Sequence, residues 1–464
     1  MITQRQFATG TDAGYLGTTI LKAAMRRISL RNLGALAAAT LFFGSCAHAA
    51  DSGRDRLERV VNEAIRPVME EYKVPGMAVA ITVQGKRYFF NYGIASKESG
   101  RRVTEDTIFE IGSVSKTFTA TLASYGQVSG NLSLSDNASK YMPALAGSAF
   151  DRISLLDLGT YTAGGLPLQF PNGVTDQDKM ITYYRNWRPS YPAGTHRLYS
   201  NPSIGLFGHL AARSMGEPFD DLVERKLFPM LGLTRTYIRV PQARMGDYAY
   251  GYTKDGKPIR VAPGIWDAEA YGVKTSAADL IRFVELNMDS SELDETLQRA
   301  IAATHTGYYR VGDMTQGLGW EMCACPTDLG RLLSTNSAEL SLKANKVTRL
   351  DPPLPPQKNV LINKTGSTNG FGAYVAFVPA EGIGIVMLAN RNYPIPARVK
   401  AAHRILSALG SEASVIKPSR AFQLQGGSTH RRNIAQRRID GIGCRTPQEA
   451  GARLKRRGGL HESQ

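Results

Sequence analysis

The chain has 464 residues, of which 42% are hydrophobic, 21% charged and 8% aromatic. Such a composition supports a large buried core and excludes a chain that is disordered throughout. The formal net charge of +16 is concentrated in residues 1–50 and 410–464, so the mildly basic body between them is not predicted to bind nucleic acid.

Residues 1–49 have the pattern of a cleaved signal peptide. Basic residues at 26–31 precede an apolar stretch at 33–43 that is too short to span a bilayer, and small residues at 47–49 fit a cleavage site. We therefore predict export to the periplasm, with no stable membrane insertion after cleavage, and Met25 is an alternative true start. An uncleaved membrane anchor is the alternative interpretation.

The cysteine pattern predicts free thiols rather than disulfides or a metal site. Cleavage would remove Cys46, which is a poor match to a lipid-attachment site, and would leave Cys323, Cys325 and Cys444. Cys323 and Cys325 are too close in sequence for a relaxed disulfide, and no cysteine or histidine cluster accompanies them. No metal and no cofactor are predicted, and no glycine-rich phosphate loop stands in the required context.

The body begins with a predicted helix over residues 55–72, where apolar side chains recur at helical spacing. Residues 76–83 predict an apolar strand, and after a Gln-Gly-Lys turn residues 87–92 predict its partner. From about 113 to 300 the sequence is mostly helical and is interrupted by turns such as Gly164-Gly165.

Strand-like sequence resumes toward the C-terminal end of the body. Residues 360–363, 373–378 and 383–388 predict a three-stranded meander, and residues 396–409 predict a closing helix. The proline-rich residues 350–356 before them predict a stiff surface connector.

Strands at both ends of the body with helices between them predict an α+β sandwich. One antiparallel sheet, built from both chain ends and flanked by helices, would carry an inserted all-helical subdomain. The domain would span residues 50–409, with an α/β part at about 50–125 and 335–409 and a helical part at about 126–334. Residues 410–464 lack apolar periodicity, which predicts a basic, disordered tail, with a surface- or nucleic-acid-binding arm as the alternative.

Three short motifs carry candidate chemistry, and the first contains Ser113 and Lys116. Gly112 permits a sharp turn, so Ser113 would begin a helix with Lys116 one turn later on the same face. A lysine amine whose pKa is lowered by burial and by nearby cations can take the serine proton, and backbone N–H groups at the helix start can bind an oxyanion. Ser-x-x-Lys is expected by chance about twice in a chain of this length, and a capped helix with an exposed lysine is the alternative.

The second motif is Tyr199-Ser200-Asn201. A phenol near two ammonium groups can be held as phenolate and shuttle protons, while the amide of Asn201 can bind a substrate carbonyl. Taken alone, this pattern is better interpreted as a buried tyrosine beside a turn asparagine.

The third motif is Lys364-Thr365-Gly366-Ser367, at the predicted end of a strand. A lysine and a hydroxyl there suit a carboxylate, Gly366 lets a substrate backbone approach closely, and the Ser367 N–H can complete an oxyanion hole. Together and in this order, the three motifs form the signature of the penicillin-recognising serine enzymes.

Over residues 51–409 the sequence resembles the class C serine β-lactamases, the periplasmic cephalosporinases. The resemblance rests on the three motifs and on four longer matching segments, which are residues 160–169, 267–272, 316–321 and 388–394. We find no Glu-x-x-Leu-Asn run of the kind that class A enzymes use for deacylation.

The resemblance implies the β-lactamase/transpeptidase fold and a monomeric enzyme that hydrolyses small-molecule β-lactams without a cofactor. It implies that Ser113 attacks the lactam carbonyl, and that Lys116 and Tyr199 manage its proton, with Lys364 as a further catalytic residue. The backbone N–H groups of Ser113 and Ser367 would bind the oxyanion.

The resemblance also assigns substrate-binding roles. Gln169 and Asn201 would bind the acylamide side chain, and Tyr271 would wall the pocket. Thr365, Asn392 and Arg398 would lie toward the substrate carboxylate, and Gly366 is a further substrate-binding residue.

The sequence departs from the family in two places. Ile395 stands where the family often has asparagine, which leaves the carboxylate contact and the substrate range open, and the family usually ends near Leu409. A DD-peptidase or carboxylesterase on the same fold, and a sensor that is acylated without turnover, are the alternative functions.

Overall fold

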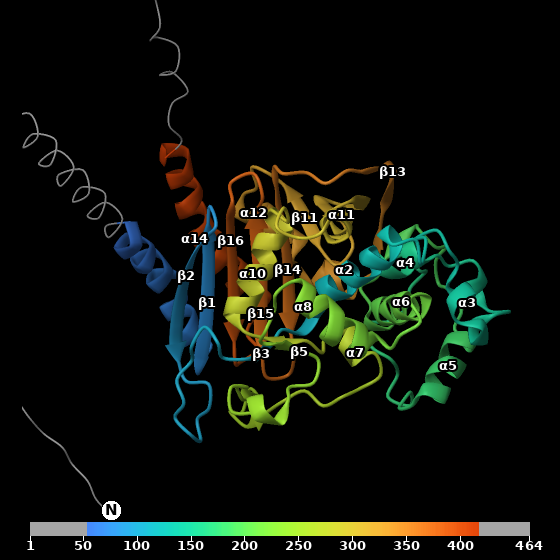
Figure 1. Cartoon of the computed structure of the whole chain (residues 1–464), viewed down its shortest axis with the longest axis horizontal. Helices are drawn as coiled ribbons and strands as arrows, with labels where there is room; N and C mark the ends of the chain where they lie inside the picture. The colour runs from blue at the N-terminus through green and yellow to red at the C-terminus, as the bar shows by residue number, and fades with distance from the viewer. Residues whose placement is uncertain (1–52, 417–464) are drawn as a thin grey trace, which may run out of the picture. The chain divides into compact units, whose positions relative to one another are not determined.

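The computed structural model describes residues 53–416. The predicted signal peptide lies outside the described residues, and so does the predicted tail from residue 417 onward. The described part is built on a nine-stranded antiparallel sheet in the order β13-β9-β10-β11-β14-β15-β16-β1-β2, with helices on its faces (Figure 1). The predicted α+β class is confirmed.

The two ends of the body meet inside this sheet. β1 (Gly76–Val83) pairs with β2 (Lys86–Gly93) on one side and with β16 (Ile383–Ala389) on the other, so that Ala80 lies opposite Val386. The blue and red strands are therefore neighbours in Figure 1. The predicted hairpin, and the predicted assembly of the sheet from both chain ends, are confirmed.

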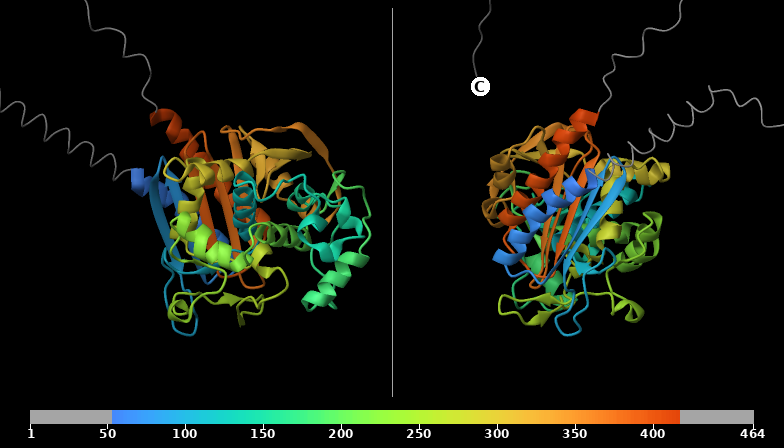
Figure 2. Two further views of the ribbon diagram at one scale, coloured as in Figure 1. Left: turned by 45° about the vertical axis from the view of Figure 1, so that its right-hand side comes forward. Right: turned by 90° about the vertical axis from the view of Figure 1, so that its left-hand side faces the viewer.

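Both faces of β1 are buried, which explains why its sequence is a continuous apolar run. Val79 packs with the helix at residues 53–71 and with α14 (Ile395–Ile416), and Figure 2 shows these two helices over one face of the sheet. Ala80 points the other way and packs with the core that includes α10 (Ala277–Met288). The predicted closing helix is confirmed, but it continues to residue 416, so residues 410–416 belong to α14 and not to the predicted tail.

The predicted meander is confirmed and forms the middle of the sheet. The sheet extends further into the chain than the predicted boundary at residue 334, because three short strands inside the predicted helical part also belong to it. Strands of three to five residues are too short to show a clear alternation of apolar side chains. The meander and these strands are β14 (Val360–Ser367), β15 (Gly372–Val378), β16, β9 (Gly307–Val311), β10 (Met314–Gln316) and β11 (Glu321–Ala324).

The proline-rich segment is exposed, as predicted, but most of it is a strand rather than a connector. β13 (Thr348–Leu354) pairs with β9 at the edge of the sheet, and its register shifts between Arg349 and Leu354. Proline lacks an N–H donor, and an irregular edge strand is the position in a sheet where this loss is tolerated.

A helical part with its own core lies between the early and late strands of the sheet. Leu158, Phe207 and Leu210 belong to this core, which also contains Tyr199. The remaining elements are β3 (Phe109–Glu110), η1 (Gly112–Val114), α2 (Ser115–Val128), α3 (Ala138–Tyr141), α4 (Leu155–Gly159), α5 (Gln177–Asn186), β4 (His196–Arg197), α6 (Asn201–Ser214), α7 (Phe219–Leu222), α8 (Phe228–Met230), β5 (Thr236–Tyr237), β6 (Gly251–Tyr252), β7 (Pro258–Ile259), α9 (Asp267–Ala270), β8 (Lys274–Thr275), α11 (Glu295–Thr304), α12 (Leu329–Thr335), α13 (Ala338–Leu342) and β12 (Asn345–Lys346).

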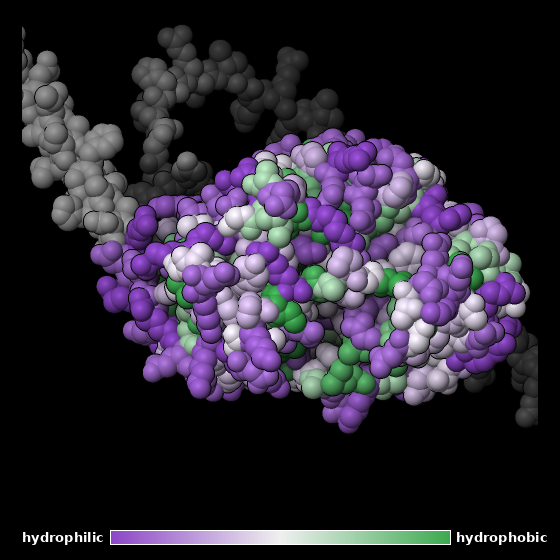
Figure 3. Space-filling view, turned by 90° about the horizontal axis from the view of Figure 1, so that it is seen from below, coloured by the Kyte–Doolittle hydropathy of each residue, from purple (hydrophilic) through white to green (hydrophobic). Residues whose placement is uncertain are grey.

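The surface seen from below Figure 1 is largely hydrophilic, and apolar side chains gather around a hollow near its middle (Figure 3). Among residues 53–416, no helix combines the length and the apolar character needed to cross a bilayer.

His305, at the end of α11, is buried against Trp320 and Phe377 and hydrogen-bonds through Nε2 to the Asn287 Oδ1 atom, 3.0 Å away. Burial lowers the pKa of His305 to about 4. In the unfolded chain the pKa of histidine is about 6.5, so the unfolded state takes up the proton first as the pH falls. The stability that the neutral imidazole contributes is complete above about pH 6.5 and is lost on acidification toward pH 4.

We therefore expect wild type to lose about 2 kcal/mol more of its free energy of unfolding between pH 7 and pH 5 than His305→Leu does. Urea unfolding at the two pH values measures this difference. His403→Leu, on α14, serves as the control for loss of a histidine. If wild type and His305→Leu lose the same free energy of unfolding, the lowered pKa of His305 is contradicted.

Candidate active site

A cavity of about 340 Å³ lies where η1, the end of β14, the start of α6 and the segment from α12 to α13 meet. It brings together residues of all three sequence motifs, which are far apart along the chain. Its lining residues are Ser113, Leu168, Gln169, Arg197, Tyr199, Asn201, Glu321, Thr335, Asn336, Leu340, Ser341, Leu342, Lys364, Thr365, Gly366, Ser367 and Ile395.

The cavity depends on a close approach between two backbone segments. Gly112 in η1 has φ +52° and lies so near β14 that a Cβ there would meet the Ser367 nitrogen at 2.5 Å. On the other side, a Cβ at Gly366 would overlap the Ile111 carbonyl oxygen. The sharp turn predicted at Gly112 is confirmed, although Ser113 lies in a 3₁₀ turn directly before α2 rather than in α2 itself.

Ser113 is half-buried at this contact, and Lys116, one turn later, is completely buried. The Lys116 Nζ atom donates to Ser113 Oγ at 3.0 Å and to the Ala270 carbonyl oxygen at 2.6 Å. Burial lowers the pKa of Lys116 to about 8, and the Lys364 cation acts in the same direction. An amine with this pKa is partly neutral near physiological pH and can accept the serine proton.

Tyr199 is buried among three cations. Lys116 Nζ and Lys364 Nζ lie 5.1 and 5.0 Å from the centre of its ring, and the Arg197 guanidinium lies 5.6 Å from it. Burial acts to raise the pKa of Tyr199, but Lys116, Lys364 and the Ser113 hydroxyl outweigh it, so that the pKa falls below that of a free phenol. The sequence predicted this proximity of a phenol to two ammonium groups, and the structure contains it.

The positive charge around Tyr199 is balanced by Glu321, whose role the sequence did not predict. Its Oε1 atom accepts from Arg197 Nη2 at 3.0 Å and from Lys364 Nζ at 3.5 Å, while Arg197 Nε donates to Gln316 Oε1. Burial acts to lower the pKa of Lys364, but Glu321 and Tyr199 raise it overall, so Lys364 stays charged. Glu321 lies in the segment 316–321, which the sequence analysis matched to the family. That match gave no information about the pairing of Glu321 with Arg197 and Lys364.

Only some of the predicted substrate-binding residues line the cavity. Gln169, Asn201, Thr365 and Gly366 line the cavity, whereas Tyr271, Asn392 and Arg398 are not among its lining residues. Leu168, from the matching segment 160–169, also lines it, and so do Thr335, Asn336 and Leu340 to Leu342, which the sequence did not single out.

Arg398 acts behind the cavity rather than in it. It is completely buried, and its guanidinium donates to the carbonyl oxygens of Gly366 at 2.6 Å and Ala373 at 3.2 Å, and also to Asn392 Oδ1. These bonds occupy the donors that the sequence had directed toward a substrate carboxylate. Arg398 therefore supports the end of β14, on which Gly366 and Ser367 lie.

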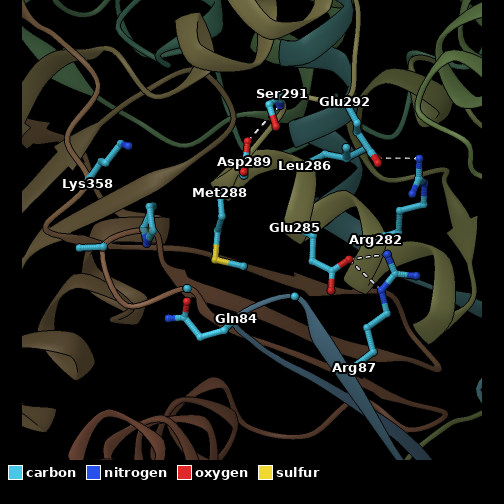
Figure 4. Close-up of a pocket in the computed structure, with 14 residues that line it drawn as sticks. Gln84, Arg87, Arg282, Glu285, Leu286, Met288, Asp289, Ser291, Glu292 and Lys358 are labelled. Atoms are coloured by element: carbon cyan, nitrogen blue, oxygen red, sulfur yellow. Dashed lines mark hydrogen bonds and ion pairs between the residues drawn. The ribbon is translucent and has the colours of Figure 1, made fainter. Parts of the chain in front are cut away.

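A larger cavity of about 610 Å³ lies beside α10, and Figure 4 shows two ion pairs among its lining residues. Glu285 accepts from Arg87, and Arg282 lies 2.9 Å from Glu292. The lining includes no residue of the three sequence motifs. Cys323 and Cys325 are free thiols, as predicted. Among the described residues, no cluster of three His, Cys, Asp or Glu side chains could hold a metal ion.

Comparison with known proteins assigns the fold to one family. The family profile described as "Beta-lactamase" matches residues 61–410. A "Beta-lactamase" of Pseudomonas fluorescens is 57% identical over 353 residues, which cover 76% of this chain and 99% of the relative.

Solved structures agree with this assignment. A class C β-lactamase in complex with cefoxitin aligns with a TM-score of 0.75 and 48% identity, over 76% of this chain and 99% of its own. A "D-alanine Carboxypeptidase" of Burkholderia cenocepacia aligns with a TM-score of 0.73 and 52% identity, over the same shares of the two chains.

The glycine contact gives a direct test of the site. We expect Gly366→Ala to reduce the labelling of Ser113 by a fluorophosphonate about a hundredfold or more, because the added Cβ would push β14 away from η1 and separate the N–H groups of Ser113 and Ser367. Overpacking of this kind also costs about 1–3 kcal/mol of stability. Gly173→Ala is the matched control, because a Cβ at Gly173 meets nothing within 4 Å. Equal labelling of Gly366→Ala and Gly173→Ala would show that the reactivity of Ser113 does not depend on the contact between β14 and η1.

Proposed function

The chain belongs to the β-lactamase family as a class C serine β-lactamase, and on that premise we propose that Ser113 is the nucleophile that opens the β-lactam ring. One observation carries the proposal: Ser113 Oγ lies 3.0 Å from Lys116 Nζ, whose pKa burial lowers to about 8, beside a cavity that both Ser113 and Tyr199 line. A serine is reactive only when such a base is within hydrogen-bonding reach.

In the acylation step, Ser113 Oγ attacks the lactam carbonyl carbon while its proton passes to Lys116 or Tyr199. The backbone N–H groups of Ser113 and Ser367 donate to the oxygen on which negative charge develops. When the tetrahedral intermediate collapses, the C–N bond of the ring breaks, and the ring nitrogen receives a proton from the same pair. The product is an ester between Ser113 and the opened lactam.

In the deacylation step, water attacks the ester carbonyl and releases Ser113. A base must take a proton from this water, and Tyr199 fits the task because two neighbouring cations lower its pKa. The proton returns to Ser113 Oγ as the C–O bond breaks, so the enzyme ends in its starting protonation state.

The charge of the cavity favours an anionic substrate. Lys116, Lys364 and Arg197 surround one phenol, and Glu321 is the carboxylate that faces them. The carboxylate of a β-lactam can lie near Thr365 and the Lys364 side of the cavity, while Gln169 and Asn201 can bind the acylamide group. Asn392 and Arg398 contribute indirectly by holding the end of β14, and Tyr271 would form an outer wall only if the substrate extends beyond the cavity.

We further propose that the enzyme is exported to the periplasm by the predicted signal peptide and acts there as a monomer on small-molecule β-lactams, which would protect the cell from these antibiotics. The arginine-rich, apolar and small-residue segments within residues 1–49 support export. Fusion of residues 1–49 to a reporter that is active only after export tests this assignment.

A second candidate function is hydrolysis of peptides that end in D-alanine. It is favoured by the 52% identity to the protein named D-alanine carboxypeptidase, and by the chemical similarity of the two acyl-enzymes. Steady-state hydrolysis of a chromogenic cephalosporin, a D-Ala-D-Ala peptide and a simple ester, measured in parallel, ranks the two activities and also tests for esterase activity.

Ser113→Ala should abolish both hydrolysis and the formation of an acyl-enzyme, while the thermal stability stays near that of wild type because the hydroxyl is half-buried at a cavity. Hydrolysis of a chromogenic cephalosporin and intact-protein mass spectrometry measure the two losses. Residual turnover above about a thousandth of wild type would exclude Ser113 as the nucleophile.

Tyr199→Phe keeps the ring between its cations and removes only the hydroxyl. We expect turnover to fall about a hundredfold or more, as is typical on loss of a general base, and the acyl-enzyme to accumulate because deacylation is the slower of the two impaired steps. Mass spectrometry under turnover conditions detects this species. Hydrolysis at a near wild-type rate would mean that Tyr199 only packs and that Lys116 or the substrate activates the water.

A further inference from the structure

The short helix α9 supplies two carbonyl groups to the helix that carries the catalytic lysine. The Glu269 carbonyl oxygen accepts from Thr119 Oγ1 at 2.6 Å, and the Ala270 carbonyl oxygen accepts from Lys116 Nζ, also at 2.6 Å. A helix of four residues does not form stably in isolation. The position of the Ala270 carbonyl, and with it the orientation of the Lys116 amine, therefore depends on what holds α9.

Trp266 precedes α9 and has an unusual backbone conformation. Its φ and ψ of 57° and 24° lie in the left-handed region, which bulky side chains rarely occupy unless the surrounding structure holds them there. The side chain packs so tightly on α6 that a Cβ at Gly205 would lie 2.5 Å from the Trp266 Cβ and 2.9 Å from Cδ1 of its ring, and the centroids of the Trp266 and His209 rings are 4.3 Å apart.

The indole of Trp266 is also tied to the start of α6. Its Nε1–H donates to the Tyr184 hydroxyl at 3.2 Å, and this fully buried hydroxyl donates to the Pro202 carbonyl oxygen at 2.8 Å. Pro202 directly follows Asn201, which lines the cavity. One side chain thus connects the helix that orients Lys116 with the turn that presents Tyr199 and Asn201.

We propose that Trp266 is a positioning residue of the active site, which clamps α9 against α6 and so keeps the Ala270 carbonyl on the Lys116 amine. The inference rests on the proposed function. A second attachment of α9 competes with this explanation, because Arg239 binds the Asp267 carboxylate through two hydrogen bonds of 2.9 and 3.1 Å. The experiment must therefore separate the indole clamp from the Arg239 ion pair.

Loosening α9 would admit water to Lys116. The charged and titratable groups that act on Lys116 are Tyr199, Lys364 of β14 and Glu321 of β11. None of these three lies on α9. Loss of the Ala270 acceptor acts to lower the pKa of Lys116, because this carbonyl stabilises the charged amine. Burial is the largest influence on the pKa, so hydration outweighs that loss and moves the pKa upward from about 8. We assign the ascending limb of the plot of kcat/KM against pH to the Lys116–Tyr199 pair. This limb would then move to higher pH.

Two variants separate the parts of the clamp. Trp266→Phe keeps an aromatic ring against Gly205 and removes the N–H donor to Tyr184. Trp266→Asn removes the ring but retains a residue that tolerates the left-handed conformation. Trp187→Phe is the matched control, because Trp187 packs against Phe150 within the same helical part and is not among the residues that line the cavity.

We expect the ascending limb for a chromogenic cephalosporin to move upward by about half a pH unit or more in Trp266→Asn, and by less in Trp266→Phe. Activity lost at pH 7 should be recovered at pH 9, which a merely destabilised enzyme would not do, and Trp187→Phe should follow wild type. If Trp266→Asn does not fold, the shift of the ascending limb in Trp266→Phe tests the inference.

An unchanged limb, or a downward shift, in an active and folded Trp266 variant would overturn the inference and leave the Arg239 ion pair as the attachment that matters. A Tyr184→Phe/Trp266→Phe double variant adds a second check, because two residues in one chain of hydrogen bonds should show effects that do not add. Simple additivity of the two shifts would also overturn it. Wild type that fails to hydrolyse cephalosporins would instead contradict the proposed function.

Discussion

The approach of β14 to η1, backbone against backbone, is the constraint on which the site depends. Gly112 and Gly366 make it sterically feasible from the two sides, and any side chain at either position would collide with the opposite strand or turn. The contact brings Ser113 and Ser367 to one cavity, and Arg398 supports it from behind through the Gly366 carbonyl oxygen. The closing helix of the chain is thereby coupled to a turn that lies almost three hundred residues earlier.

A second constraint follows from burying charge at this contact. Each uncompensated ion in an interior costs several kcal/mol, so three cations near one cavity require partners. Glu321 compensates Arg197 and Lys364, while Lys116 is compensated chiefly by a lowered pKa and by the Ala270 carbonyl oxygen. This division leaves one lysine charged and one able to exchange a proton, which is the combination that a serine nucleophile and its phenol neighbour require.

Several elements could be predicted from the sequence because their signal is local. The apolar run at 76–83, the turn after it and the meander toward residue 388 carry strand patterns long enough to recognise, and Gly112 signals its own turn. The short strands β9 to β11 could not be recognised, since a few residues do not show a period. Residues 350–356 were predicted as a connector because proline-rich segments are stiff, and only the pairing of β13 with β9 makes most of them an edge strand.

The sequence by itself determined the order and chemical types of the three motifs, and hence the candidate nucleophile, base and phenol. The tertiary structure decided which groups face one another: Glu321 between Arg197 and Lys364, Arg398 behind β14 rather than in the cavity, and α9 under Lys116. These relations join residues tens to hundreds of positions apart. Local patterns cannot contain them, because the distance between two side chains, and with it their pKa values, is set only when the elements that carry them have packed.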